Sequence, residues 1–252
     1  MTASPQAGSW RQQGSLWVLT PPRPSALVEF IGGSYLAATP QLSYRRLLEA
    51  LARQGLMVRA WSYVPGFDHQ AQANEAWRSF RQARERQPLD LPGGILRLGH
   101  SLGCKLHLLA PDNGRGCSGL VALSFNNFSA ERSVPLLAEL GPRLGFSSEF
   151  SPSPEETLRL VGAHYRQPRN LLVRFNRDGI DQSQRLQAVL QARPQDQTQL
   201  LELPGDHLTP ASAGLRQNLL GAWADDPSRQ RQIDALAETI SRWWSPAAAQ
   251  PA

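Results

Sequence analysis

The feature that most constrains the fold of this chain is a serine flanked by two glycines, in the segment Gly99-His100-Ser101-Leu102-Gly103. Residues 95–98 are mostly apolar and predict a strand, and residues 102–109 predict a helix. A direct connection between them is a sharp turn, in which side chains at the two glycine positions would clash. The segment therefore predicts a strained turn that presents the Ser101 hydroxyl at the end of a strand.

Short apolar runs alternate with helical patterns along most of the chain. Strands are predicted at 16–20, 27–31, 57–63, 95–98, 120–125, 171–175 and 199–203. Helices are predicted at 44–54, 71–86, 102–109, 182–192 and 228–244. This alternation is typical of βαβ units, so we expect an α/β fold with a mostly parallel sheet flanked by helices.

The chain has 252 residues, a length that fits one large domain. We expect this domain at 15–245, between a mobile N-terminus at 1–14 and a disordered tail at 246–252. Residues 126–168 interrupt the alternation, with helical patches at 134–140 and 155–164. Because structureless loops of this length are uncommon in compact domains, we interpret the segment as a small inserted cap over the sheet's carboxyl edge.

A serine hydroxyl becomes a good nucleophile when a neighbouring base removes its proton. The chain has five histidines, and only His207 follows a late strand, the one at 199–203. His69 begins a helix and is expected at the surface. We therefore predict His207 as the base for Ser101.

A carboxylate would hold the imidazole in the correct tautomer and stabilise its charged form. Two aspartates, Asp178 and Asp181, follow the strand at 171–175. Asp178 is favoured because the acid is expected about three residues past the last core residue of the strand. Asp181 is the alternative, and its other interpretation is a helix N-cap. Asp206 is adjacent to His207 in the chain and is poorly placed to orient the ring.

Attack on a carbonyl creates an oxyanion, which needs two hydrogen-bond donors. One is expected to be the backbone N–H of Leu102, directly after the serine. The second should come from the loop after an early strand, where Gly32 and Gly33 let a substrate approach the backbone. We predict the N–H of Gly33 or of Ser34 as this second donor.

These motifs resemble the α/β-hydrolase superfamily over residues 16–244. More narrowly, the sequence resembles domain-of-unknown-function family 1350, a group from photosynthetic organisms. The similar segments are Phe30-Ile31-Gly32-Gly33, Gly99 to His107, Ser124-Phe125-Asn126-Asn127, and Asn176 to Ser183. The resemblance implies the α/β-hydrolase fold and, by superfamily analogy, a Ser-Asp-His triad; it implies no substrate.

Charge and composition exclude several other classes. The net charge is +5 and the pI about 9.9, but the arginines are scattered and Lys105 is the only lysine, so we expect no nucleic-acid partner. The possibility of weak attraction to an anionic membrane surface stays open.

The sequence contains no run of 18 or more apolar residues, so it predicts no transmembrane helix. The polar N-terminus lacks a signal sequence, and Cys104 and Cys117 lie outside metal-binding motifs, so we expect a reduced, cytoplasmic protein without metal or cofactor.

Together these patterns predict a serine hydrolase of the esterase, thioesterase or lipase kind, acting on a small-molecule, lipid-like ester or thioester with an apolar acyl group. The predicted substrate pocket comprises Phe125, Phe128, Leu137 and Leu140. Two alternatives stay open. One is an inactive scaffold of the same fold that binds a lipid, pigment or protein, and the other is an acyltransferase.

Overall fold

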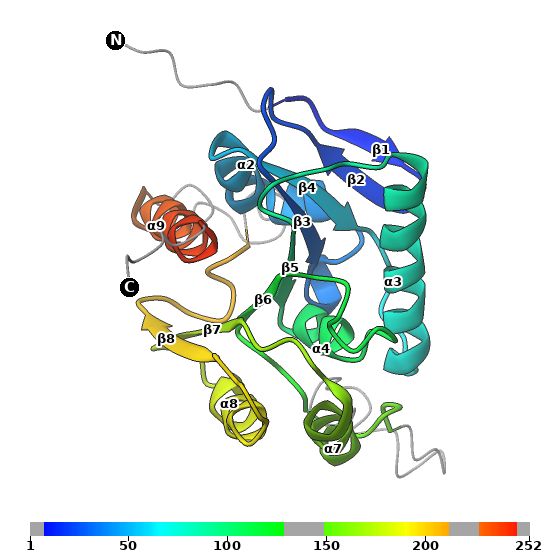
Figure 1. The fold of residues 1–252 in the computed structure, drawn as a ribbon. Helices are drawn as coiled ribbons and strands as arrows, with labels where there is room; N and C mark the ends of the chain where they lie inside the picture. The colour runs from blue at the N-terminus through cyan, green and yellow to red at the C-terminus, as the bar shows by residue number, and fades with distance from the viewer. Residues whose placement is uncertain (1–7, 129–148, 212–226, 246–252) are drawn as a thin grey trace, which may run out of the picture.

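The computed structural model describes residues 8–128, 149–211 and 227–245. Its centre is an eight-stranded sheet with the order β1-β2-β4-β3-β5-β6-β7-β8 (Figure 1). The strands are β1 (Arg11–Gln13), β2 (Leu16–Leu19), β3 (Ala26–Ile31), β4 (Leu56–Trp61), β5 (Ile95–His100), β6 (Gly119–Leu123), β7 (Asn170–Phe175) and β8 (Gln199–Leu203). From β4 to β8 every neighbouring pair is parallel, whereas β1 and β2 pair antiparallel at one edge. The predicted mostly parallel sheet is confirmed.

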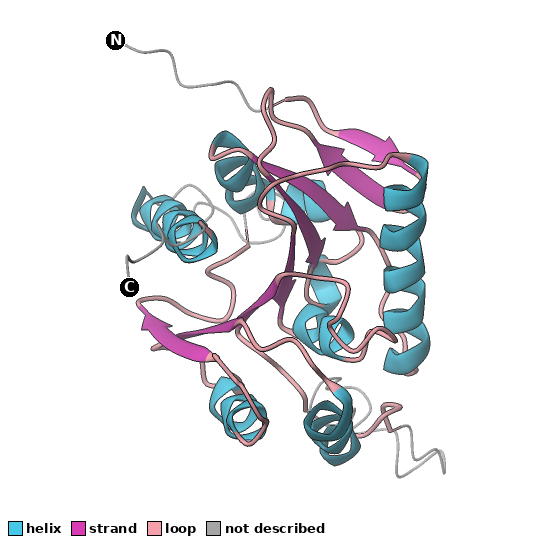
Figure 2. Ribbon diagram, in the orientation of Figure 1, coloured by secondary structure: helices cyan, strands magenta, loops and turns pink. Residues whose placement is uncertain are grey.

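Helices cover both faces of this sheet (Figure 2). Helices α2 (Arg45–Arg53) and α9 (Pro227–Trp244) pack together on one face. The opposite face carries α3 (His69–Arg86), α4 (Leu102–Leu108), α7 (Pro154–His164) and α8 (Ser183–Gln191). A short 3₁₀ helix, η1 (Ser34–Leu36), and helix α1 (Pro40–Ser43) connect β3 to α2. No helix in the described ranges is both long and apolar enough to cross a membrane.

The central strands are buried on both faces because helices cover both. In β3, Val28 and Phe30 face α2 and α9, while Leu27 and Ile31 face α3 and α4. Successive side chains of a strand point to opposite faces, so a strand covered on both sides reads as a nearly continuous apolar run. This is why the central strands were visible in the sequence as short, mostly apolar segments, although β3, β4 and β5 each contain one buried charged residue, Glu29, Arg59 and Arg97.

Two segments differ from the sequence-based expectation. Residues 11–13, within the N-terminus expected to be mobile, form β1 and pair with β2. Helix α7, predicted as part of a cap, packs beside α8 through Val161, in a core cluster that also contains Leu172 and Leu186. This described part of the interruption therefore belongs to the helix layer, and the patch at 134–140 lies outside the described residues.

The turn between β5 and α4 has the geometry that its glycines require. Ser101 has φ 54° and ψ −120°, a backbone conformation that residues with a side chain rarely adopt. A Cβ at Gly99 would lie 2.6 Å from the Cys104 nitrogen, and one at Gly103 would overlap the carbonyl oxygen of Ile31 in β3. The start of α4 therefore approaches β3 so closely that only glycine fits.

Parallel strands end at the same edge of the sheet, and this edge collects the predicted site residues. Ser101 follows β5, Gly33 follows β3, Asp178 follows β7 and His207 follows β8. In open α/β sheets, ligands bind outside the carboxyl ends of the strands. The topology alone therefore brings residues more than 100 positions apart, Ser101 and His207, to one place.

We predict that Gly103→Ala strongly destabilises the protein, because the added methyl group meets backbone that cannot move aside as a flexible side chain would. Urea unfolding should show a loss of at least about 3 kcal/mol. Gly179→Ala is the matched control, since nothing lies within 4 Å of a Cβ at that position, and its effect should stay within about 0.5 kcal/mol. Equal stabilities of the two variants would contradict the close contact between α4 and β3.

Candidate active site

Three predicted residues from three different loops form a hydrogen-bonded row. The Ser101 hydroxyl donates to His207 Nε2 at 3.0 Å, and His207 Nδ1 donates to Asp178 Oδ2 at 2.8 Å. Ser101 is only 9% exposed, so its hydroxyl lies in a largely enclosed environment. This is the geometry that nucleophile, base and orienting acid require.

Of the two candidate acids, only Asp178 contacts the His207 ring. Its second carboxylate oxygen accepts a hydrogen bond from the Ile180 N–H at 3.0 Å. Burial opposes ionisation of this carboxyl, but the hydrogen bond and charge of His207, with the Ile180 N–H, outweigh it and hold the pKa of Asp178 below its usual range. Asp178 is therefore an anion at neutral pH.

The other two nearby carboxylates have structural partners. Asp181 accepts from the Ser183 N–H at 3.0 Å and from the Ser183 hydroxyl at 2.7 Å, at the start of α8. Asp206 forms an ion pair with Arg229 at 2.6 Å. Each carboxylate is therefore engaged away from the His207 ring.

One predicted oxyanion donor is already engaged. The Gly33 N–H donates to the Tyr44 hydroxyl at 2.8 Å, so it is not available to a substrate oxygen. Ser34 begins η1 and Leu102 begins α4, and the first N–H groups of a helix have no acceptor within it. Neither N–H has a partner among the described residues, so Ser34 rather than Gly33 is the candidate second donor.

A buried hydrogen-bond chain supports this arrangement, and sequence reasoning missed it. The Tyr44 hydroxyl, which accepts from Gly33, donates to His100 Nδ1 at 2.7 Å, and His100 Nε2 donates to the His207 carbonyl oxygen at 2.8 Å. Burial lowers the pKa of His100 to about 3, so the ring is neutral and can accept at one nitrogen while donating at the other. The chain joins the loops that carry Gly33, Ser101 and His207.

A cavity of about 210 Å³ opens at this row and is lined by Ser101 and His207. Its apolar walls come from side chains of six residues, Leu36, Leu102, Phe128, Phe150, Ile180 and Leu208. Phe128, which the sequence analysis assigned to the substrate pocket, thus lines this cavity. Phe125, also predicted to line the pocket, lies instead in the core cluster beside α8. Leu137 and Leu140 lie outside the described residues.

The cavity also contains polar residues that the sequence did not single out. His69, expected at the surface, is only 3% exposed and lines the cavity, because Phe150 covers it with ring centroids 4.2 Å apart. Lys105 and the amides Asn126 and Asn127 line it as well. The sequence could have indicated Lys105 as a site residue, because it is the only lysine of the chain and lies four residues after Ser101.

Two further observations concern metals and charged partners. Within residues 8–128, 149–211 and 227–245, no group of three or more His, Cys, Asp and Glu side chains could hold a metal ion.

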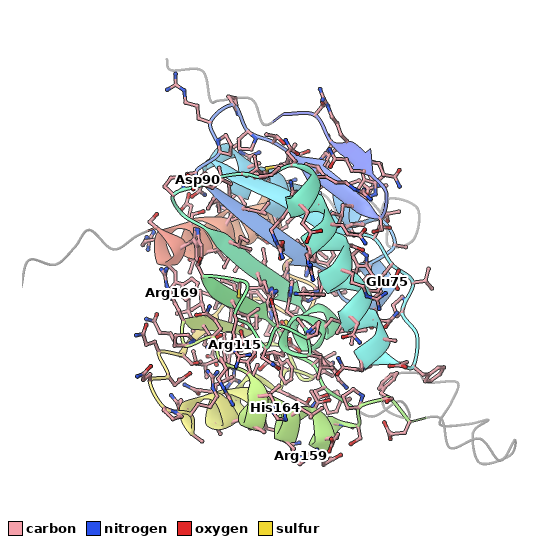
Figure 3. The ribbon with its side chains drawn as sticks, turned by 45° about the vertical axis from the view of Figure 1, so that its right-hand side comes forward. Glu75, Asp90, Arg115, Arg159, His164 and Arg169 are labelled. Carbon is pink, nitrogen blue, oxygen red and sulfur yellow. The ribbon has the colours of Figure 1, made fainter. Side chains whose placement is uncertain are left out.

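Three arginines labelled in Figure 3, Arg115, Arg159 and Arg169, lie apart on different segments. Arg159 is paired with Glu156 on its own helix, and Arg169 packs on the Trp243 ring.

Several solved enzymes share this fold. S-formylglutathione hydrolase (FrmB) from Staphylococcus aureus matches with a TM-score of 0.59 at 16% identity, covering 94% of this chain and 97% of that chain. Carboxyl esterase 2 (TmelEST2) from the mycorrhizal fungus Tuber melanosporum matches with 0.58 at 15% identity, over 90% and 80%. Monoacylglycerol lipase from Paleococcus ferrophilus matches with 0.57 at 16% identity, over 90% and 99%. These likenesses confirm the predicted α/β-hydrolase fold.

Sequence comparison adds the family. No curated protein matches the chain in sequence. Residues 9–246 match the family described as protein of unknown function (DUF1350), as the motifs around Ser101 and Asp178 had suggested. The chain therefore belongs to the DUF1350 family, and its fold is that of the α/β-hydrolases.

Proposed function

We propose that this protein is a serine hydrolase that cleaves a small-molecule ester or thioester with a largely apolar acyl group. In this proposal Ser101 is the nucleophile, His207 the general base and Asp178 the acid that orients it. The observation that carries the proposal is the hydrogen-bonded row from Ser101 through His207 to Asp178, with distances of 3.0 and 2.8 Å. The fold neighbours, an S-formylglutathione hydrolase, a carboxyl esterase and a lipase, support ester hydrolysis at the level of the fold.

The proposed reaction begins with transfer of the Ser101 proton to His207 Nε2 as Oγ attacks the carbonyl carbon. Asp178 stabilises the imidazolium, and the N–H groups of Leu102 and Ser34 bind the oxyanion. The tetrahedral intermediate then expels the alcohol or thiol, which takes the proton from His207, and an acyl-serine remains. Water gives a proton to His207 and attacks this ester, and collapse returns the proton to Ser101 and releases the acid.

Ser101→Ala tests the nucleophile. The wild-type protein should react with a fluorophosphonate probe and hydrolyse p-nitrophenyl esters. Ser101→Ala should lose labelling, and its hydrolytic activity should fall by several orders of magnitude. Ser79→Ala, on helix α3, is the matched control and should label like the wild type. A wild type that neither labels nor cleaves any ester or thioester would favour an inactive binding scaffold.

A second pair of variants separates the two aspartates. Asp178→Asn should lower kcat about 10⁴-fold, as the equivalent change does in the chymotrypsin-type triad, because the amide favours the wrong His207 tautomer. Asp181→Asn should mainly reduce stability, by about 1 kcal/mol, since it weakens the contacts to Ser183. Steady-state kinetics and urea unfolding measure both effects. The reverse ranking would identify Asp181 as the acid, and two mild losses would remove the acid from this loop.

A further inference from the structure

Lys105 is a buried cation in the wall of the cavity at Ser101. It lies on α4, one helical turn after Ser101, and is only 1% exposed. Lys105 and Ser101 line the same cavity. The ammonium group is therefore within the reach of a molecule whose carbonyl is bound at Ser101.

The hydrogen-bonding capacity of this ammonium group is largely unused. Of its three N–H donors, one bonds the Pro152 carbonyl oxygen at 3.0 Å. The Phe150 ring lies 5.9 Å from Nζ, and in the described ranges no carboxylate forms an ion pair with it. Burial lowers the pKa of Lys105 to about 8, although Glu149 and Glu155 act to raise it, so most of the population is charged at pH 7. A buried charge without a counter-ion is costly and favours binding of an anion.

A second polar group in the same wall also lacks a partner. The Nδ1 atom of His69 is buried and has no hydrogen-bond partner among the described residues. The ring packs under Phe150, with 4.2 Å between ring centroids, and burial together with the charge of Lys105 lowers the His69 pKa to about 3. His69 is therefore a neutral hydrogen-bonding group beside a cation that has no ion-pair partner among the described residues.

The sheet order indicates which part of the substrate meets these groups. His69 follows β4 in the chain and His207 follows β8, and these strands lie on opposite sides of β5, which carries Ser101. The leaving group must lie near His207, which protonates it. The acyl group therefore extends toward His69 and Lys105, between apolar walls that include Leu102 and Phe150.

We propose that the acyl group of the substrate carries an anionic end, such as a carboxylate, that binds Lys105. This inference rests on the proposed hydrolase function and specifies its substrate class: an ester or thioester with an apolar acyl chain that terminates in a negative charge. Apolar walls with a few polar groups are typical of sites that select one orientation of a ligand.

The test compares two series of esters. Wild-type kcat/KM is measured for p-nitrophenyl monoesters of adipic, suberic and sebacic acid and for the p-nitrophenyl esters of hexanoic, octanoic and decanoic acid. We expect at least about a tenfold preference for the anionic ester at one chain length, which corresponds to one charge-assisted hydrogen bond. The preference should persist at high salt, because a buried pair is weakly screened. A ratio of one or less at every chain length would overturn the inference.

Variants assign the preference to Lys105. Lys105→Met, which retains most of the stem without the charge, should bring the anionic-to-neutral ratio close to one, and Lys105→Arg should retain a preference. Arg81→Met, which removes a positive charge from an exposed site on α3, should leave the wild-type ratio. Retention of the full ratio in Lys105→Met would also overturn the inference, and fluorophosphonate labelling of each variant verifies that it is folded.

Different results would contradict the hydrolase proposal and the proposed role of Lys105. Cleavage of the neutral esters without a preference for the anionic ones removes the role of Lys105 and leaves the hydrolase proposal intact. Absence of cleavage in both series, with Ser101 unlabelled, contradicts the hydrolase proposal itself.

Discussion

The close approach of α4 to β3 is the constraint on which the site depends. Because Gly103 lies against the Ile31 carbonyl oxygen, the chain has no room for an ordinary loop between β5 and α4. Ser101 is consequently held at φ 54°, with its hydroxyl directed toward the carboxyl edge of the sheet. The same contact places the first N–H of α4, that of Leu102, beside the loop that follows β3. Strain at one residue thus positions both the Ser101 hydroxyl and a hydrogen-bond donor.

A neutral hydrogen-bond chain connects the loops around this turn. It runs from the Gly33 N–H through Tyr44 and His100 to the backbone carbonyl of His207, and every donor in it meets an acceptor. Satisfied buried networks are rigid, because breaking any one bond leaves a polar group without a partner. These hydrogen bonds therefore fix the position of the backbone at His207, and the His207 ring contacts Ser101 and Asp178.

Buried charges fall into two groups in this protein. On the α3 side of the sheet, Glu29 lies in register between Arg59 and Arg97, and Arg97 forms two hydrogen bonds with Asp112 at 2.9 and 2.6 Å. Glu29 forms an ion pair with Arg84 and lies 3.8 Å from Arg97, whereas the buried guanidinium nitrogens of Arg59 have no hydrogen-bond partner among the described residues. Lys105 has no ion-pair partner in the part of the chain that the structure describes, and it lines the cavity at Ser101. The two groups therefore differ in their place in the fold, and Lys105 is the charge that we propose binds the anionic end of the substrate.

The sequence by itself determined the sheet, because strands buried on both faces are mostly apolar, and it determined the turn at Ser101, because only glycine fits at its flanks. The tertiary structure separates candidates that look alike in the sequence. It brings Asp178 to the His207 ring while Asp181 is bonded to Ser183, and it engages the Gly33 N–H with Tyr44. The role of Tyr44 and the burial of His69 depend on loops that follow different strands. Such contacts join residues far apart in the chain, and no local pattern encodes them.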